Sequence, residues 1–311
     1  MVERDKAKEF DYGGQAVMEG VMMRGRKSMA VAVRHPSGKI VIHNEPLESP
    51  IYTSRWWRLP FLRGLVVLWD TLGLGMRSLI YSANVALEEE EVEFRGPAVW
   101  GLVFVSLAFA IGIFFLVPLL LVGLIDRLIA SALVSNLIEG VLRLGLFVGY
   151  IGLIGLLPDI RRFFAYHGAE HKTINAYEAG APLDPTSVAG YTTAHTRCGT
   201  GFVLFVLVLS IFVFALLGRP PFIWRILSRL LLIPLIVSVI YEFIKFAARR
   251  QDNPLLRAVV SPGLALQSLT TREPDEEMLE VAIVALTSLL TEESGGNEFT
   301  RQGVGDRIGV S

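Results

Sequence analysis

Cysteine and charge are both scarce in this chain. Among its 311 residues there is one cysteine, Cys198, which excludes an internal disulfide framework and any cysteine-rich zinc or iron–sulfur site. Charged residues make up 19%, below the roughly 25% that is typical of soluble proteins. The net charge of −1 supplies no basic field, so nucleic acid is not an expected partner. Residues 1–14 are charged and lack an apolar run, so we expect no cleavable signal peptide.

Long apolar stretches stand where the charge is missing. Residues 97–125 contain no Asp, Glu, Lys or Arg, and these 29 residues exceed the ~20 that a helix needs to cross a bilayer. Hydrophobic residues reach 52% and the mean hydropathy is +0.50. The sequence therefore predicts a mainly α, polytopic helical membrane protein that contacts the lipid bilayer. The four expected spans are residues 97–125, 136–157, 200–217 and 222–246.

Short links pair these spans into two hairpins. Only residues 218–221 separate the third span from the fourth, and the first link is nearly as short. Both termini and the central loop then share one side, which also carries more of the flanking Lys and Arg, so we expect both termini in the cytoplasm. We divide the chain into an N-terminal β-hairpin segment (1–58), an interfacial or re-entrant helix (59–96), a first transmembrane hairpin (97–157), a metal-site loop (158–199), a second transmembrane hairpin (200–247), cytoplasmic amphipathic helices (248–291) and a disordered tail (292–311).

The N-terminal segment contains two β-branched runs, residues 28–34 and 39–43. Between them, Pro36 and Gly38 supply turn chemistry, so the pattern predicts a β-hairpin. Residues 13–25 are rich in glycine and methionine and show no helical stripe. We interpret them as a packed irregular loop, in which the glycines permit close approach of another backbone or of a ligand.

Two further segments have amphipathic character. Residues 59–86 are apolar but carry Arg63, Asp70 and Arg77 at a spacing of seven, which places the three charges along one side of a helix. We expect this helix to lie in the membrane surface or to re-enter the membrane, because three central charges are costly in a span; a true span is the alternative. Residues 273–277 predict the start of a second amphipathic helix, with Pro274 at its first position.

The loop between the second and third spans contains the pattern H-x-x-E-H. His167 and His171 are four residues apart and share one face of a helix, and Glu170 directly precedes the second histidine. In metalloprotease helices of this type the imidazoles bind zinc and the glutamate acts as general base. The pattern therefore predicts a divalent-metal site, most concretely zinc, with Glu170 as the catalytic residue.

The same loop ends with His195 and Cys198, at the entry to the third span. Adjacent antiparallel spans pack ~8–10 Å apart, so connectivity brings the two ends of the loop together. His167, His171 and His195 then supply three nitrogen ligands, with Cys198 as an alternative ligand. Polar residues that merely line the membrane interface are the competing interpretation.

Three other residues of this loop are candidates for supporting roles. Glu178 falls on the same helical face as the histidines, but it lies roughly 10 Å along the axis from His171. In a continuous helix it can therefore only orient a ligand or bind elsewhere. The other two candidates are Lys172, which follows His171, and Arg197, which precedes Cys198.

The motifs at residues 13–25, 167–172 (His-Gly-Ala-Glu-His-Lys), 195–200 (His-Thr-Arg-Cys-Gly-Thr) and 269–274 together resemble the YqhQ-like family. The resemblance covers most of residues 11–290. It implies a multispanning protein of a bacterial inner membrane, in a family often described as predicted metal-dependent enzymes.

Two classes of function follow from these patterns. The first is a metal-dependent hydrolase that acts at the cytoplasmic face on a membrane-proximal substrate such as a peptide or lipid. The alternative is a non-enzymatic scaffold or accessory subunit with membrane protein partners, since the hairpin and the amphipathic helices suit protein contacts equally well. Transport is less favoured because little charge lies deep within the first three spans. No pattern in the sequence fixes an oligomeric state.

Overall fold

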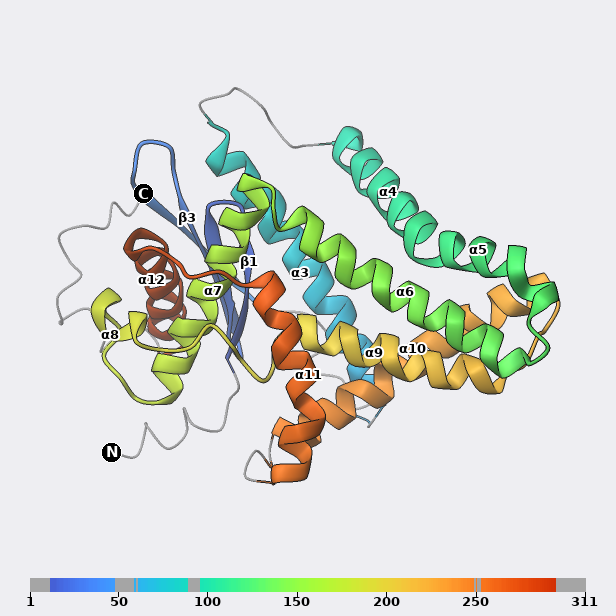
Figure 1. The fold of residues 1–311 in the computed structure, drawn as a ribbon. Helices are drawn as coiled ribbons and strands as arrows, with labels where there is room; N and C mark the ends of the chain where they lie inside the picture. The colour runs from blue at the N-terminus through green and yellow to red at the C-terminus, as the bar shows by residue number, and fades with distance from the viewer. Residues whose placement is uncertain are drawn as a thin grey trace.

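The computed structural model describes residues 12–47, 59, 61–88, 96–248, 250 and 253–294. A small sheet and its covering helices form one end of the molecule, and long apolar helices extend from it to the other end (Figure 1). The strands are β1 (Gly13–Val17), β2 (Gly20–Arg24), β3 (Ser28–Arg34) and β4 (Ile40–Pro46). The helices are α3 (Leu62–Ala86), α4 (Pro97–Ile111), α5 (Val117–Ile125), α6 (Ala132–Ile154), α7 (Pro158–Glu178), α8 (Pro185–Ala189), α9 (Gly199–Leu216), α10 (Phe222–Ala248), α11 (Pro254–Thr270) and α12 (Glu276–Glu293).

The four strands form an antiparallel meander in the order β1-β2-β3-β4. The predicted hairpin is confirmed as β3 and β4, with Val31 opposite His43. The prediction of an irregular loop over residues 13–25 is wrong, because β1 and β2 pair along their whole length. Four of the five residues of β2 are buried, so both of its faces are covered and the alternation that reveals a half-buried strand is missing.

Helices cover both faces of this sheet. One face carries Met23, Ala30 and Ala32, which belong to a buried cluster with α7 and α12. The other face carries Met22 and Met29, which pack against Leu74 of α3. The sheet is therefore the middle layer between α3 and the pair α7/α12, and this layering fixes α7 against the glycine-rich strand β1.

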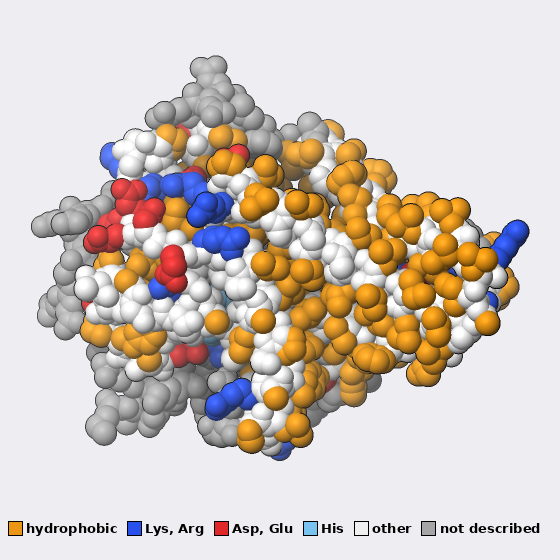
Figure 2. Space-filling model, in the orientation of Figure 1, with side chains coloured by type: hydrophobic (Ala, Val, Ile, Leu, Met, Phe, Trp, Pro, Cys, Tyr) orange, Lys and Arg blue, Asp and Glu red, His pale blue; other side chains and the backbone are white. Residues whose placement is uncertain are grey.

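Four helical segments are long and apolar enough to cross a membrane, which confirms the predicted number of spans within the described part of the chain. They are Val99–Leu128, Ala132–Ile154, Gly199–Leu216 and Ile223–Ala248. Their apolar side chains face outward and dominate the surface at this end of the molecule (Figure 2). The first of these segments contains a π-helical stretch, Gly112–Leu116, between α4 and α5.

Helix α3 is not among these four segments. Its charged stripe is paired with protein: Arg63 with Glu242 of α10, Asp70 with Arg24 of β2 at 2.7 Å, and Arg77 with Glu45 at 2.8 Å. The remaining surface of α3 exposes large apolar side chains, among them Trp69 and Leu72. A helix with one paired charged stripe and one exposed apolar face is typical of a helix that lies in a membrane surface.

The C-terminal helix α12 begins slightly later than the sequence predicted. Asp275 is its N-cap, and the Asp275 carboxylate accepts a hydrogen bond from the backbone N–H of Met278 at 2.8 Å. Pro274 therefore precedes the cap rather than occupying the first helical position. The difference arises because a side-chain carboxylate satisfies a free N–H at the helix start, which a proline cannot do. The predicted disorder of 292–311 falls, from residue 295 onward, outside the described residues.

Candidate metal centre

Helix α7 positions the first half of the site. It starts at Pro158, with three residues between it and the end of α6, and runs without a break to Glu178. His167 and His171 are one turn apart on it, and their ring centroids are 4.4 Å apart. The sequence prediction that both imidazoles share one face of a helix is therefore met in the structure.

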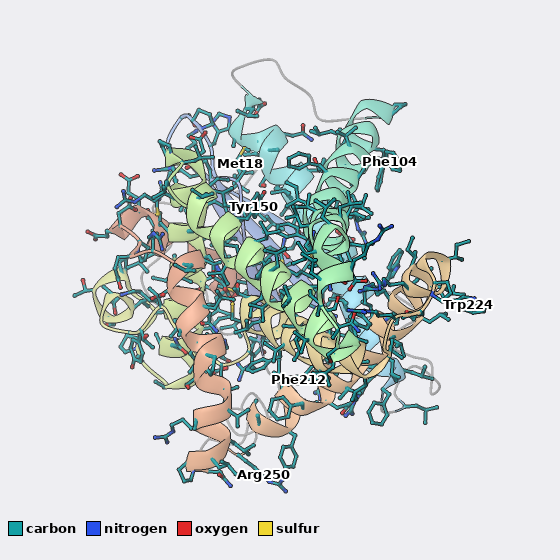
Figure 3. The ribbon with its side chains drawn as sticks, turned by 45° about the vertical axis from the view of Figure 1, so that its right-hand side comes forward. Met18, Phe104, Tyr150, Phe212, Trp224 and Arg250 are labelled. Carbon is teal, nitrogen blue, oxygen red and sulfur yellow. The ribbon has the colours of Figure 1, made fainter. Side chains whose placement is uncertain are left out.

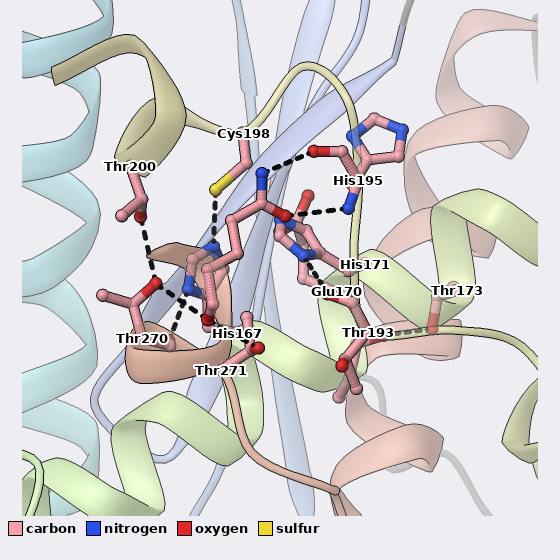
Figure 4. A network of polar contacts seen from close by, with 12 residues as sticks. His167, Glu170, His171, Thr173, Thr193, His195, Cys198, Thr200, Thr270 and Thr271 are labelled. Carbon is pink, nitrogen blue, oxygen red and sulfur yellow. Dashed lines mark hydrogen bonds and ion pairs between the residues drawn. The ribbon is translucent and has the colours of Figure 1, made fainter. Parts of the chain in front are cut away.

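The segment that leads into α9 supplies the third group. Asn175 of α7 donates its side-chain N–H groups to the carbonyls of Thr192 and Ala194, at 2.9 and 3.1 Å, and so holds this segment on the helix. Cys198, the N-cap residue of α9, then lies with its Sγ 3.5 Å from Nε2 of His167 (Figure 4). The two ends of the loop meet because α7 and the start of α9 are tied together by these hydrogen bonds.

The ligand atoms of His167, His171 and Cys198 all lie within 4.8 Å of one another. Both imidazoles donate from Nδ1 to a backbone carbonyl, His167 to Thr270 at 2.9 Å and His171 to Thr193 at 2.6 Å. A carbonyl can only accept, so Nδ1 carries a proton in each ring, and Nε2 is the nitrogen that each ring would offer to a metal ion. A histidine that binds a metal through one ring nitrogen usually donates the N–H of its other ring nitrogen to such an acceptor. Ligand atoms around zinc lie roughly 3.3–3.8 Å apart. The limit of 4.8 Å is wider than this, so the two imidazoles and the thiol could hold a divalent ion once their side chains move slightly inward.

Glu170 is 3% exposed, and its Oε2 lies 3.5 Å from Nε2 of His171. Its side chain packs against β1 at Gly14, where an added Cβ would lie 2.8 Å from Cγ of Glu170 and 2.6 Å from the Met22 carbonyl oxygen. Glycine at position 14 therefore makes room for the carboxylate. The close approach that the glycine-rich motif suggested is an approach to the backbone of a neighbouring strand and to this glutamate.

His195 is held differently from the other two histidines. Its ring centroid is 5.5 Å from that of His171, but its Nε2 lies 3.8 Å from Glu178, which also pairs with Arg197. Burial alone would raise the pKa of Glu178, but hydrogen bonds from His195 and Arg197 leave that pKa below its ordinary value. The structure thus brings Cys198, the alternative ligand, to the two histidines of α7. Glu178 orients His195 and Arg197 rather than joining the group.

Lys172 also lies outside the ligand group. Its Nζ donates to the carbonyl of Ala189 at 2.8 Å and pairs with Glu273 at 2.8 Å. These contacts fix α8 and the segment after α11 to helix α7. Lys172 is therefore a structural neighbour of the site.

Helix α11 contributes residues that the sequence analysis did not single out. Gln267, 2% exposed, accepts from the backbone N–H of His195 at 2.9 Å and donates to its carbonyl at 2.8 Å. Thr270 supplies the carbonyl that orients His167. The chain after α11 crosses α7 at Gly168, where an added Cβ would lie 2.1 Å from the Arg272 carbonyl oxygen. Two signals in the sequence pointed to this region: Gln267 and Thr270 are polar residues at helical spacing, and Thr270 lies within the motif at residues 269–274.

The fold and the site together define a helical protein whose four apolar helices indicate a membrane protein and whose central loop holds a group of His and Cys side chains suited to a metal ion. The chain belongs to the family of proteins of unknown function DUF1385, whose profile matches residues 59–292. It is also 34% identical over 292 residues to the uncharacterized protein YqhQ of Bacillus subtilis (strain 168), an alignment that covers 90% of this chain and 92% of that protein. These matches confirm the family resemblance. No solved structure matches the chain.

Proposed function

We propose that this protein is a metal-dependent hydrolase of the bacterial cytoplasmic membrane. His167 and His171 through Nε2, and Cys198 through Sγ, would hold the ion, most concretely zinc. The observation that carries the proposal is that these three atoms lie within 4.8 Å of one another. Both imidazoles are also oriented by hydrogen bonds from Nδ1 to backbone carbonyls. Three protein ligands that leave one position free are the donor set of catalytic zinc.

Glu170 is the proposed general base. A zinc ion in such a site lowers the pKa of a bound water to about 7 and polarises a substrate carbonyl. Glu170 lies beside the ligand atom of His171 at 3.5 Å, so its carboxylate can take a proton at Oε2 without moving away from β1. Its burial excludes bulk water, and a proton held on Glu170 can then be returned to a leaving group.

The substrate is proposed to be membrane-proximal. Three residues separate helix α7 from the span α6, and Cys198 is the N-cap residue of the span α9, so the site lies where two spans end. Lys and Arg gather near this end of the spans, which supports a cytoplasmic orientation of the site and of both termini. Peptides and lipids at that surface are the proposed substrate classes.

A structural role of the metal is the second candidate, and the burial of the site favours it. His171 is 2% exposed, and the centre ties α7 to the segment before α9 and, through Thr270, to α11. In that case the protein is a scaffold or accessory subunit of a membrane complex, and the ion holds its parts together.

Matched pairs of variants separate these functions. Purified protein is assayed for bound metal, and each variant is tested for complementation of a strain that lacks the gene. His171→Ala should lose the metal, whereas His195→Ala should retain it, because His195 faces Glu178. Glu170→Gln should keep the metal but lose activity by about 10²–10⁴-fold, since an amide accepts no proton. Glu178→Gln, the same change on the same helix, should leave more activity than Glu170→Gln.

Two outcomes would contradict the proposal in different ways. Wild-type protein purified gently, without chelator, and found free of metal would remove the metal centre altogether. Metal retained together with full complementation by Glu170→Gln would leave the ion in a structural role and support the scaffold.

A further inference from the structure

A second polar centre lies within the membrane helices, at the end opposite the metal centre. The buried face of α6 carries Ser135, Asn136, Glu139 and Arg143 in the first half of this candidate span. Glu139 is 2% and Arg143 5% exposed. Charged groups inside a span are costly in lipid, and where they occur they face the helix bundle and mark functional sites. The proposed hydrolase chemistry makes no use of these residues.

Glu139 binds two of the arginines. Its Oε1 accepts from Arg143 at 2.6 Å and from Arg229 of α10 at 2.6 Å. Nε of Arg143 donates to the carbonyl of Phe114 at 2.9 Å, within the π-helical stretch of the first span. Arg229 also stacks over the ring of Phe214, 5.1 Å from its centroid. These contacts hold four helical segments together. The negative charge of one carboxylate is shared between two positively charged guanidinium groups.

Arg225 adds a third guanidinium to the same face, one turn before Arg229 on α10. The Nε atoms of both Arg225 and Arg229 are buried and have no hydrogen-bond partner among the described residues. Arg219, the nearest cation on the adjoining link, is already paired with Asp126 at 3.1 Å. One glutamate therefore pairs with two arginines, Arg143 and Arg229, and Arg225 brings a further positive charge close by in the chain. The unused Nε–H donors of Arg225 and Arg229 both lie on α10.

The position of Arg225 places this excess charge at the membrane boundary. Arg225 is the fourth residue of α10, and the neighbouring Trp224 is 62% exposed and projects outward from the helices (Figure 3). An exposed tryptophan at the end of a span is typical of the headgroup layer of a bilayer. Lipid phosphates occupy the same layer, and guanidinium groups bind phosphate oxygens through paired N–H donors.

From these observations we infer that Arg225 and Arg229 form a binding site for a phosphate-bearing anion at this end of the helix bundle. Glu139, itself bound by Arg143, holds Arg229 in place from the interior side. Two sources supply this chemistry, the headgroup of an anionic lipid and free phosphate. Because the site is remote from His167, His171 and Cys198, it stands independently of the proposed function.

The test is the thermal stability of the purified full-length protein in a neutral detergent, with added phosphatidylglycerol, phosphatidylcholine or inorganic phosphate. A ligand that binds only the folded state raises Tm with its concentration. Phosphatidylglycerol should raise Tm, and phosphatidylcholine, whose headgroup is neutral overall, should not. A comparable rise with inorganic phosphate alone would support the site and assign it to free phosphate; its absence would assign the site to the lipid.

Arg225→Gln should weaken the apparent affinity for the ligand, read from the concentration dependence of Tm, about tenfold. The reason is the loss of charge-assisted hydrogen bonds. Arg127→Gln is the matched control, because Arg127 is exposed at the same end of the helices and should leave the effect intact. Should Arg225→Gln fail to accumulate, Arg225→Lys keeps the charge without the paired donors and should bind with intermediate affinity. Full stabilisation of either Arg225 variant, or an equal loss with Arg127→Gln, would overturn the inference.

Discussion

The metal centre and the arginine cluster (Arg143, Arg225 and Arg229 with Glu139) satisfy buried polar groups in opposite ways. At the metal centre, imidazoles donate from Nδ1 to backbone carbonyls, and Nε2 of each ring is turned toward the ligand group. In the arginine cluster, ionised groups bind one another, and the surplus is positive charge. The first arrangement leaves lone pairs for a cation, and the second leaves N–H donors for an anion. Polarity alone therefore does not indicate which kind of ligand a buried site binds; the hydrogen-bond partners do.

Removal of the single carboxylate from the arginine cluster should have the largest effect on stability. Glu139→Leu leaves Arg143 and Arg229 without their common partner inside the helix bundle. Breaking a buried ion pair from one side costs about 3–5 kcal/mol. Unfolding of the purified protein in detergent measures the change, and Glu139→Gln, which keeps an acceptor oxygen, is the control with a smaller loss. Equal stability of Glu139→Leu and wild type would mean that apolar packing alone holds these helices together.

A single methyl group should disturb the metal centre. At Gly168 an added Cβ would lie 2.1 Å from the Arg272 carbonyl oxygen, so Gly168→Ala must push the chain after α11 away from α7. Overpacking of this kind costs about 1–3 kcal/mol. Thr270 moves with this segment, so the metal content should fall as well.

Gly152→Ala is the matched control, because nothing lies within 4 Å of a Cβ built at Gly152 in α6. Alanine is favoured over glycine in a helix interior by about 1 kcal/mol, so this variant should be as stable as wild type or more so. If Gly168→Ala retained both stability and metal, the crossing of the two segments would have to be looser than the structure indicates.

The smallest effects should distinguish two ion pairs of helix α3. Asp70 and its partner Arg24 are largely buried, with side-chain exposures of 8% and 19%, whereas Arg77 is 63% exposed. Asp70→Asn should cost about 1.5 kcal/mol, as expected for a hydrogen bond to a charged group. Arg77→Gln should cost less than about 1 kcal/mol, as for surface pairs, and its effect should vanish in high salt. Denaturant unfolding of both variants at two salt concentrations measures this difference, and equal losses would show that the stripe is uniformly solvated.

The sequence predicted the features that depend on local pattern. Apolar length located the four spans, and proline and glycine between two β-branched runs located the β3–β4 hairpin. Strand β2 was missed because a strand buried on both faces has no alternation. Strand β1 was missed because it begins with two glycines, which are depleted in strands. Among the candidate ligands, helical spacing placed His167 and His171 correctly side by side.

The remaining parts of the two centres depend on contacts between residues far apart in the chain. His195 and Cys198 lie in an irregular segment, where spacing does not determine which side chain faces α7. Gln267 reaches the site across 72 residues, and Arg229 reaches Glu139 across 90. No periodicity within one chain segment encodes such pairs. The sequence analysis therefore did not predict that these arginines and Glu139 come together.

The crossing at Gly168 also has a consequence for the comparison of sequences within the family. Any side chain at this position collides with the backbone after α11, so a protein that shares this arrangement is restricted to glycine between its two histidines of α7. A distant homologue with a larger residue there must route its C-terminal segment differently and cannot orient His167 through the same carbonyl. One column of a future alignment, at a residue that binds nothing itself, would therefore separate proteins that have inherited this centre from those that have kept only the membrane helices.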